Sequence, residues 1–331
     1  MLNILLIVFW LIFLIYGAGN LVKWAASLSV GMWVPQIVVG LTVVAFWTST
    51  PELLVNILSA YKWSTDIAIG NIVGSNLGNI LLILWTTLLL SDIPVKKNTT
   101  WKEIPFAILS SLLLYIMASD IVLNKETSNM LSSSESLVLL CIFCIFLYYI
   151  FAISFSNIEQ TQWEKIEVYS IKKSILYSVF WLILLFIWWK ILVEWAVNIA
   201  RVLGVSEMLI GLTIVAIGTS LPEFVTSIVA VRKKQTDMVI GNIIGSNIFN
   251  VFWILWITGV FGAVPISKEA YIDIQFLLVC SLMVFLFLFL SKDLYRTKNW
   301  FHSDVYILKR WQWGILVITY MVYVTYLINR G

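Results

Sequence analysis

Apolar segments of about twenty residues, the length of a membrane-spanning helix, follow one another along the whole chain. Short polar stretches separate them. The hydrocarbon core of a bilayer offers no hydrogen-bond partners, so a chain that crosses it must satisfy its backbone internally, as an α-helix does. The sequence therefore predicts an all-α integral membrane protein.

Composition agrees with this prediction. Of the 331 residues, 61% are hydrophobic and only 12% are charged, whereas soluble domains carry about 25% charged residues. The first segment, Met1 to Tyr16, lacks a basic start and a small-residue cleavage site, so we expect a spanning helix there and not a signal peptide. We predict ten spans, at 4–22, 34–60, 66–91, 103–119, 135–155, 174–198, 206–231, 237–262, 272–290 and 311–328.

An internal repeat divides the chain into two halves. When the sequence is shifted by 171 residues, residues 9–87 align with the second half without a gap. Residues 65–79 and 236–250 are then identical at ten of fifteen positions. We therefore predict a first repeat at 1–155, a linker at 156–173 and a second repeat at 174–331.

The placement of Lys and Arg predicts the orientation of the halves. With the N-terminus outside, cytoplasmic segments hold fifteen of the 21 basic residues and external segments hold five. Each half has five predicted spans, and an odd number inverts the second half relative to the first. Both termini are then outside, and the protein is a multi-pass protein of the cell membrane. Inverted repeats with a site at the midplane are typical of secondary transporters.

Glu52 and Glu223 occupy the same repeat position, near the middle of their predicted spans. An ionisable residue at that depth is costly and normally serves an ion or proton pathway. A neutral glutamic acid, hydrogen-bonded to a facing helix, is the alternative. Oxygen-bearing residues surround both carboxylates, which favours a cation site; they are Thr48, Ser49, Ser75, Asn79, Thr219, Ser220, Ser246 and Asn250.

Prolines adjoin both glutamates. Pro51 and Pro222 cannot donate a backbone hydrogen bond and should bend their helices, freeing carbonyls near Ala45 and Ala216. Broken helices with such carbonyls bind cations in many transporters. Ca²⁺ takes oxygen ligands, and two carboxylates would balance its charge. Na⁺ can use the same hydroxyls and carbonyls.

These motifs resemble the cation/Ca²⁺ exchanger superfamily, specifically bacterial and archaeal Na⁺/Ca²⁺ antiporters. The resemblance implies ten helices, alternating access through sliding of spans 1 and 6, and ion ligation by Glu52 and Glu223. It also implies that the eight residues with oxygen-bearing side chains and the carbonyls of Ala45 and Ala216 complete the site. Some members carry Asp where this chain has Asn79 or Asn250, which leaves the coupling ion and the stoichiometry open.

Ca²⁺/Na⁺ antiport is the function that the sequence predicts, with Ca²⁺ and Na⁺ as transported ions and no cofactor. A Ca²⁺/H⁺ or K⁺-coupled exchanger on the same fold is the alternative. An intramembrane hydrolase would need a nucleophile with a base or an Asp pair, but the only histidine, His302, lies in a polar loop. Cys141 and Cys144 form an isolated CxxC within an apolar helix and are expected to be packing residues. No feature indicates nucleic acid, and the oligomeric state is not predicted.

Tryptophan stands where the repeat or the family has glycine. Trp33 and Trp47 align with Gly204 and Gly218, and Trp188 aligns with Gly17. The chain has only 16 glycines, about 5%, against an average of about 7%. The codon UGA is read as Trp in some genetic codes and as Gly in others. We hypothesise that glycine occupies nine such positions in the native protein: Trp10, Trp24, Trp33, Trp47, Trp85, Trp181, Trp188, Trp195 and Trp256.

Overall fold

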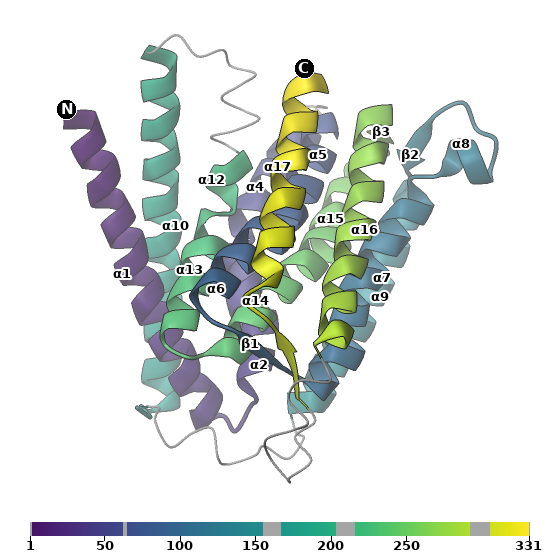
Figure 1. The fold of residues 1–331 in the computed structure, drawn as a ribbon. Helices are drawn as coiled ribbons and strands as arrows, with labels where there is room; N and C mark the ends of the chain where they lie inside the picture. The colour runs from purple at the N-terminus through teal and green to yellow at the C-terminus, as the bar shows by residue number, and fades with distance from the viewer. Residues whose placement is uncertain (1, 62–64, 155–166, 203–215, 292–304, 331) are drawn as a thin grey trace.

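A computed structural model describes residues 2–61, 65–154, 167–202, 216–291 and 305–330. These residues form a bundle of helices with both chain ends at the same end of the bundle (Figure 1). Most of the predicted linker, residues 155–166, lies outside the described residues.

The first half contains long helices interrupted by short π-helical segments. Its helices are α1 (Leu2–Gly31), α2 (Gln36–Val39), η1 (Gly40–Val44), α3 (Ala45–Thr48), α4 (Thr50–Tyr61), α5 (Thr65–Leu77), η2 (Gly78–Ile83), α6 (Leu84–Leu90), η3 (Thr99–Glu103), α7 (Ile104–Met117), α8 (Asp120–Leu123) and α9 (Ser133–Ser154). The second half contains α10 (Ile171–Val202), α12 (Ala216–Thr219), α13 (Leu221–Arg232), α14 (Thr236–Phe249), η6 (Asn250–Ile254), α15 (Leu255–Val260), α16 (Lys268–Leu290) and α17 (Gln312–Arg330).

Length and apolar composition qualify seven described helices as membrane spans, and an eighth if a bent pair counts as one span. The bent pair is Gln36–Thr48 with Thr50–Tyr61, at 44°. These eight match eight of the ten expected spans within a few residues. Helix α1 covers the expected first span, and the expected seventh span, 206–231, is described only from Ala216.

Matching backbone irregularities recur at the repeat spacing. Ser49 ends the helix before Glu52 with φ −84° and ψ 8°, and Ser220 precedes α13 with φ −83° and ψ 3°. Segments η2 and η6 are both π-helical, and Asn79 and Asn250 lie within them. Insertions of this kind occur often at functional sites, because they redirect side chains.

Two small sheets join the halves. Strand β1 (Ile93–Lys96) pairs antiparallel with β4 (Val305–Leu308), and β2 (Asn129–Leu131) pairs antiparallel with β3 (Val264–Ile266). In each sheet, one strand comes from each half. The start of β3 lies 171 residues after the start of β1, so the two sheets follow the repeat.

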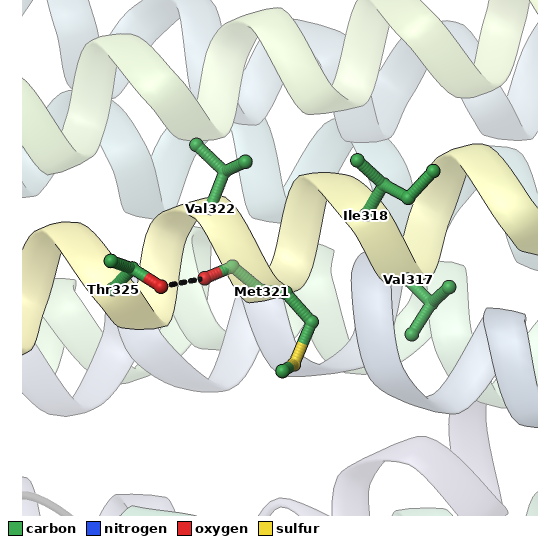
Figure 2. A pocket seen from close by; sticks show the side chains of 5 residues that line it. All are labelled: Val317, Ile318, Met321, Val322 and Thr325. Atoms are coloured by element: carbon green, nitrogen blue, oxygen red, sulfur yellow. Dashed lines mark hydrogen bonds between the residues drawn. The ribbon is translucent and has the colours of Figure 1, made fainter.

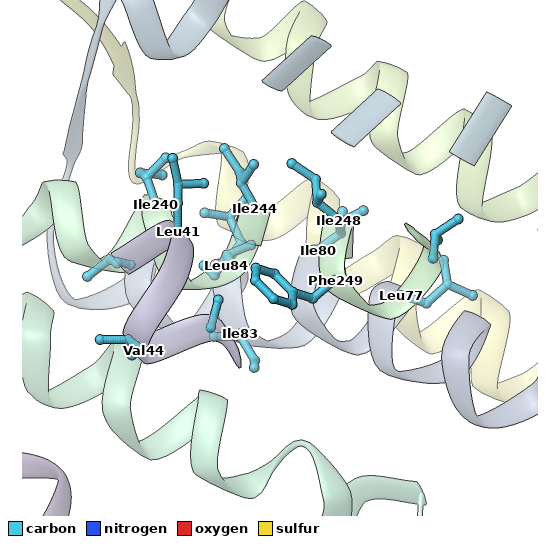
Figure 3. Close-up of a cluster of buried hydrophobic side chains, with 14 of the residues drawn as sticks. Leu41, Val44, Leu77, Ile80, Ile83, Leu84, Ile240, Ile244, Ile248 and Phe249 are labelled. Atoms are coloured by element: carbon cyan, nitrogen blue, oxygen red, sulfur yellow. The ribbon is translucent and has the colours of Figure 1, made fainter. Parts of the chain in front are cut away.

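The most buried helices carry the polar motifs. The span Thr236–Val260 is 94% buried, whereas Gln312–Arg330 is 17% buried. Apolar side chains from both halves pack around the central segments, among them Leu41, Leu84 and Phe249 (Figure 3). In lipid the outer surface can be apolar, so the polar residues gather inside.

Helices α1 and α10 lie side by side at one edge of the bundle (Figure 1). Ser27 Oγ lies 3.0 Å from Ser174 Oγ, and the Trp24 ring stacks on that of Tyr177. Lys23 Nζ is 2.6 Å from the carboxylate of Glu167, which belongs to the described part of the predicted linker. The hydrogen bond from this ammonium group lowers the pKa of Glu167, so the pair stays charged at neutral pH.

Trp33 has a backbone conformation that favours glycine. Its φ is 56°, and it follows the end of α1. Its N–H donates to Val30 O at 3.1 Å, and the N–H of Val34 donates to Ser29 O at 2.9 Å. These two bonds define a Schellman motif, and Trp33 occupies the left-handed position where glycine is the usual residue. This geometry supports the glycine hypothesis independently of the repeat.

The other tryptophans give a mixed result. An added Cβ at Gly17 would lie 2.6 Å from the Trp188 ring, so the ring fills the closest approach of α1 and α10. The indole N–H groups of Trp85, Trp181 and Trp256 are buried without an acceptor among the described residues. Trp47 differs from these, because its side chain is 37% exposed and its ring contacts that of Phe46.

We predict that Trp33→Gly stabilises the purified protein by about 1 kcal/mol, since it relieves the left-handed strain of a bulky residue. Thermal unfolding in detergent measures the change. Met32→Gly is the matched control: Met32 is also exposed, but its φ is not positive. At that position glycine only increases the conformational entropy of the unfolded chain, so no stabilisation is expected. Equal effects of both variants would contradict the assignment.

We also predict that the gene carries UGA at the nine tryptophan positions and that native peptides contain glycine there. Mass spectrometry of the protein from its own cells, read beside the codons, tests this. A peptide with the mass of Trp at residue 33, or UGG codons throughout, would exclude the hypothesis.

Candidate functional site

Glu52 and Glu223 lie directly after the helix breaks. Glu52 lies in the first turn of α4, and Glu223 lies in the first turn of α13. Both side chains are 1% exposed, although carboxylates are rarely buried without partners. The predicted proline break is confirmed in the first half by the 44° bend.

Serines from each half hold the carboxylate of the other half. Ser49 Oγ donates to Glu223 Oε1 at 2.9 Å. Ser220 Oγ donates to Glu52 Oε1 at 3.5 Å and also lies 3.2 Å from Ser75 Oγ. Within each half the neighbouring helix adds a further donor: Ser75 Oγ reaches Glu52 Oε1 at 2.9 Å, and Ser246 Oγ reaches Glu223 Oε1 at 3.5 Å. The two halves therefore form one site.

Asn79 and Asn250 meet the opposite half through their amide nitrogens. Asn79 Nδ2 donates to Asn247 Oδ1, and Asn250 Nδ2 donates to Asn76 Oδ1, both at 2.9 Å. All four side chains are buried. The nitrogen of each π-helical asparagine is thus engaged by the opposite half, which leaves its oxygen available.

Among the predicted site residues that the structure describes, four buried oxygens have no hydrogen-bond donor. They are Glu52 Oε2, Glu223 Oε2, Asn79 Oδ1 and Asn250 Oδ1. Unsatisfied buried acceptors are costly and call for an explanation. Carboxylate and amide oxygens are among the ligands that a hard cation such as Ca²⁺ takes in proteins.

Three of the remaining predicted residues, Thr48, Thr219 and Ala45, are buried. Thr48 Oγ1 donates to Asn242 Oδ1 at 3.1 Å. The prediction that Pro51 frees the carbonyl of Ala45 is wrong, because this oxygen accepts the Ser49 N–H at 3.0 Å and the Thr48 hydroxyl at 3.3 Å. Ala216 is the first residue of α12.

Several asparagines that support the glutamates were missed. Asn71 Nδ2 donates to the backbone oxygen of Glu52 at 3.2 Å, and Asn242 Nδ2 donates to that of Glu223 at 3.3 Å. Asn71 also reaches Asn56 Oδ1 at 2.7 Å. Their repetition at the same spacing, like that of Asn76 and Asn247, was a sequence signal for a shared role.

The surface hollows lie away from the carboxylates. One of about 340 Å³ lies on α17 and is lined by aliphatic residues, Met321 and Thr325 (Figure 2). A smaller cavity of about 40 Å³ is apolar except at Asn247 and Ser281.

Cys141 and Cys144 are exposed on α9, so the expectation that they are packing residues is wrong. His302 is outside the described residues, which contain no cluster of His, Cys, Asp and Glu able to hold a metal.

Comparison with known proteins gives consistent results over the whole chain. The chain is 27% identical to the sodium/calcium exchanger MaX1 of Methanosarcina acetivorans, over 98% of both proteins. It is 30% identical to the inner membrane protein YrbG of Escherichia coli, over 80% of this chain and 82% of YrbG.

Among solved structures, the sodium-calcium exchanger NCX_Mj matches with a TM-score of 0.81 and 29% identity, over 98% of both chains. The profile of the family described as sodium/calcium exchanger protein matches residues 2–152 and 173–329, one segment in each half. The chain therefore belongs to the sodium/calcium exchanger protein family.

Proposed function

We propose that this protein is a secondary antiporter that exchanges Ca²⁺ for Na⁺ across the cell membrane. The ions bind between the two halves, at Glu52 and Glu223. The observation that carries this proposal is the set of four buried oxygens without donors on these glutamates and on Asn79 and Asn250. A bound cation would satisfy all four, and family membership supports the choice of ions.

Charge balance supports a divalent ion. The two glutamates are the carboxylates of the site, and both neighbouring asparagines are neutral. Two carboxylates balance one Ca²⁺, and the serine and threonine hydroxyls can complete an oxygen shell of six to eight ligands. Na⁺ ions can use the same oxygens in turn, and the hydroxyl-rich site offers ligands for several of them.

Alternating access is proposed to occur through movement of α1 and α10 against the rest of the bundle. The two helices pack on each other at its edge (Figure 1). The glutamates are shielded from solvent in this structure, so another arrangement must open the site to each side. We place ten spans in two inverted repeats, at 1–155 and 174–331, with both termini outside.

We predict that Glu52→Gln and Glu223→Gln each abolish Ca²⁺ transport. Each removes one of the two charges that offset the ion where the effective dielectric constant is low. Uptake of radiolabelled Ca²⁺ into proteoliposomes, driven by an outward Na⁺ gradient, measures the loss.

Glu103→Gln is the matched control for these variants. Glu103 is also 1% exposed, and its Oε2 also lacks a donor among the described residues. It differs in lying in η3, where its Oε1 accepts a hydrogen bond from the Tyr149 hydroxyl and not from the serines around Glu52 and Glu223. We expect this variant to keep most of its transport. Near-normal uptake by Glu52→Gln or Glu223→Gln would show that the ion site is elsewhere.

We further predict that exchange moves net positive charge in the direction in which Na⁺ moves, because the resemblance to this family implies more than two Na⁺ per Ca²⁺. A valinomycin-set membrane potential should then change the rate of Ca²⁺ uptake. The same vesicles with K⁺ or H⁺ gradients in place of Na⁺ test the coupling ion. Uptake that follows a proton gradient and is insensitive to the potential would favour a Ca²⁺/H⁺ exchanger.

A further inference from the structure

We propose that Asn76 and Asn247 are positioning residues that hold the site amides with their oxygens toward the ion. This inference rests on the proposed function. We call Asn76, Asn79, Asn247 and Asn250 the amide clamp. Asn79 and Asn250 are the residues that face the ion, and Asn76 and Asn247 fix the direction of their side chains from the opposite half.

An amide needs such positioning, whereas a carboxylate does not. One end of an Asn side chain accepts hydrogen bonds and the other end donates two. Rotation by half a turn would aim the positive Nδ2 hydrogens at a cation. The two oxygens of a carboxylate are equivalent, so either orientation presents an acceptor.

The hydrogen bonds select one orientation at both asparagines. Asn79 Nδ2 is held by Asn247 Oδ1 and Asn250 Nδ2 by Asn76 Oδ1, both at 2.9 Å. Asn79 Oδ1 and Asn250 Oδ1 are the atoms left without donors. Asn76 Nδ2 in turn donates to the backbone oxygen of Asn247 at 3.3 Å, which ties the two positioning residues together.

Burial makes the selection effective. All four side chains are at most 4% exposed, so no bulk water competes for the amide nitrogens. The arrangement crosses the two halves, because each positioning residue lies on α5 or α14 and its partner lies on η6 or η2. The orientation of the two amides that face the ion therefore depends on how the two halves are aligned.

Helix packing is the competing explanation, since small polar residues often join helices in membranes. The two explanations differ when the partner is changed. A packing role predicts the same loss whatever residue stands at 79 or 250. A positioning role predicts that the loss shrinks when the partner becomes a carboxylate, because an aspartate has no wrong orientation.

The experiment compares Asn247→Leu and Asn76→Leu in the full-length protein, alone and combined with Asn79→Asp or Asn250→Asp. We expect each Leu variant alone to raise the KM for Ca²⁺ by about ten-fold or more, the size of one hydrogen bond to a charged group. Asn79→Asp should reduce the effect of Asn247→Leu but not that of Asn76→Leu. Asn250→Asp should do the reverse, so each pair is the control for the other.

A second measurement keeps this test separate from the proposed function. Ca²⁺ and Na⁺ each raise the Tm of a protein that binds them, and this shift reads binding without transport. If the unmutated protein binds cations but transports none, the clamp is still tested by the Tm shift. Equal losses in all backgrounds, an unchanged KM in the Leu variants, or no cation-dependent Tm shift in the unmutated protein would overturn the proposal.

Discussion

The burial of two carboxylates away from water is the constraint on which the rest of this structure depends. An ionised glutamate inside a bilayer is costly unless other groups replace its hydration. Around Glu52 and Glu223 the replacement comes from serine hydroxyls, with one oxygen of each carboxylate held and the other left open. The helix breaks at Ser49 and Ser220 come directly before the glutamates, and the two π-helical segments carry the neighbouring asparagines. Apolar residues pack around these polar groups or face lipid.

The crossed contacts explain why a repeat is useful here. Ser49 serves Glu223 and Ser220 serves Glu52, so neither half has a complete site by itself. The two sheets that join the halves, β1 with β4 and β2 with β3, restrain how far the halves can separate. Neither sheet includes residues of α1 or α10, which pack mainly on each other at one edge of the bundle.

Much of the site was predictable because its signals are local and doubled. Glu52, Pro51 and the hydroxyls around them recur in the second half, and their expected burial and proximity are observed. The strands were not predicted, because three or four residues carry no periodicity and their pairing depends on how the halves meet. Asn76 and Asn247 were missed because their hydrogen bonds run to the opposite half, and spacing within one helix does not predict which residues meet there. The carbonyl of Ala45 was overestimated, since it accepts the ordinary helical bond from the Ser49 N–H, four residues on. The bond that Pro51 cannot make would have ended on the carbonyl of Trp47.

The absence of charge at positions 79 and 250 connects these features. A carboxylate at either position would attract a cation in any rotamer, but it would also add a charge that one Ca²⁺ could not balance alongside Glu52 and Glu223. An amide avoids that excess, and it binds a cation only when its oxygen is held in the right direction. In the proposed function the two glutamates would then supply two charges for one divalent ion, and the hydrogen bonds between the halves would orient the amides. A motion that shifts α5 against α14 would alter both amides together, because the bonds that orient them also join the two repeats.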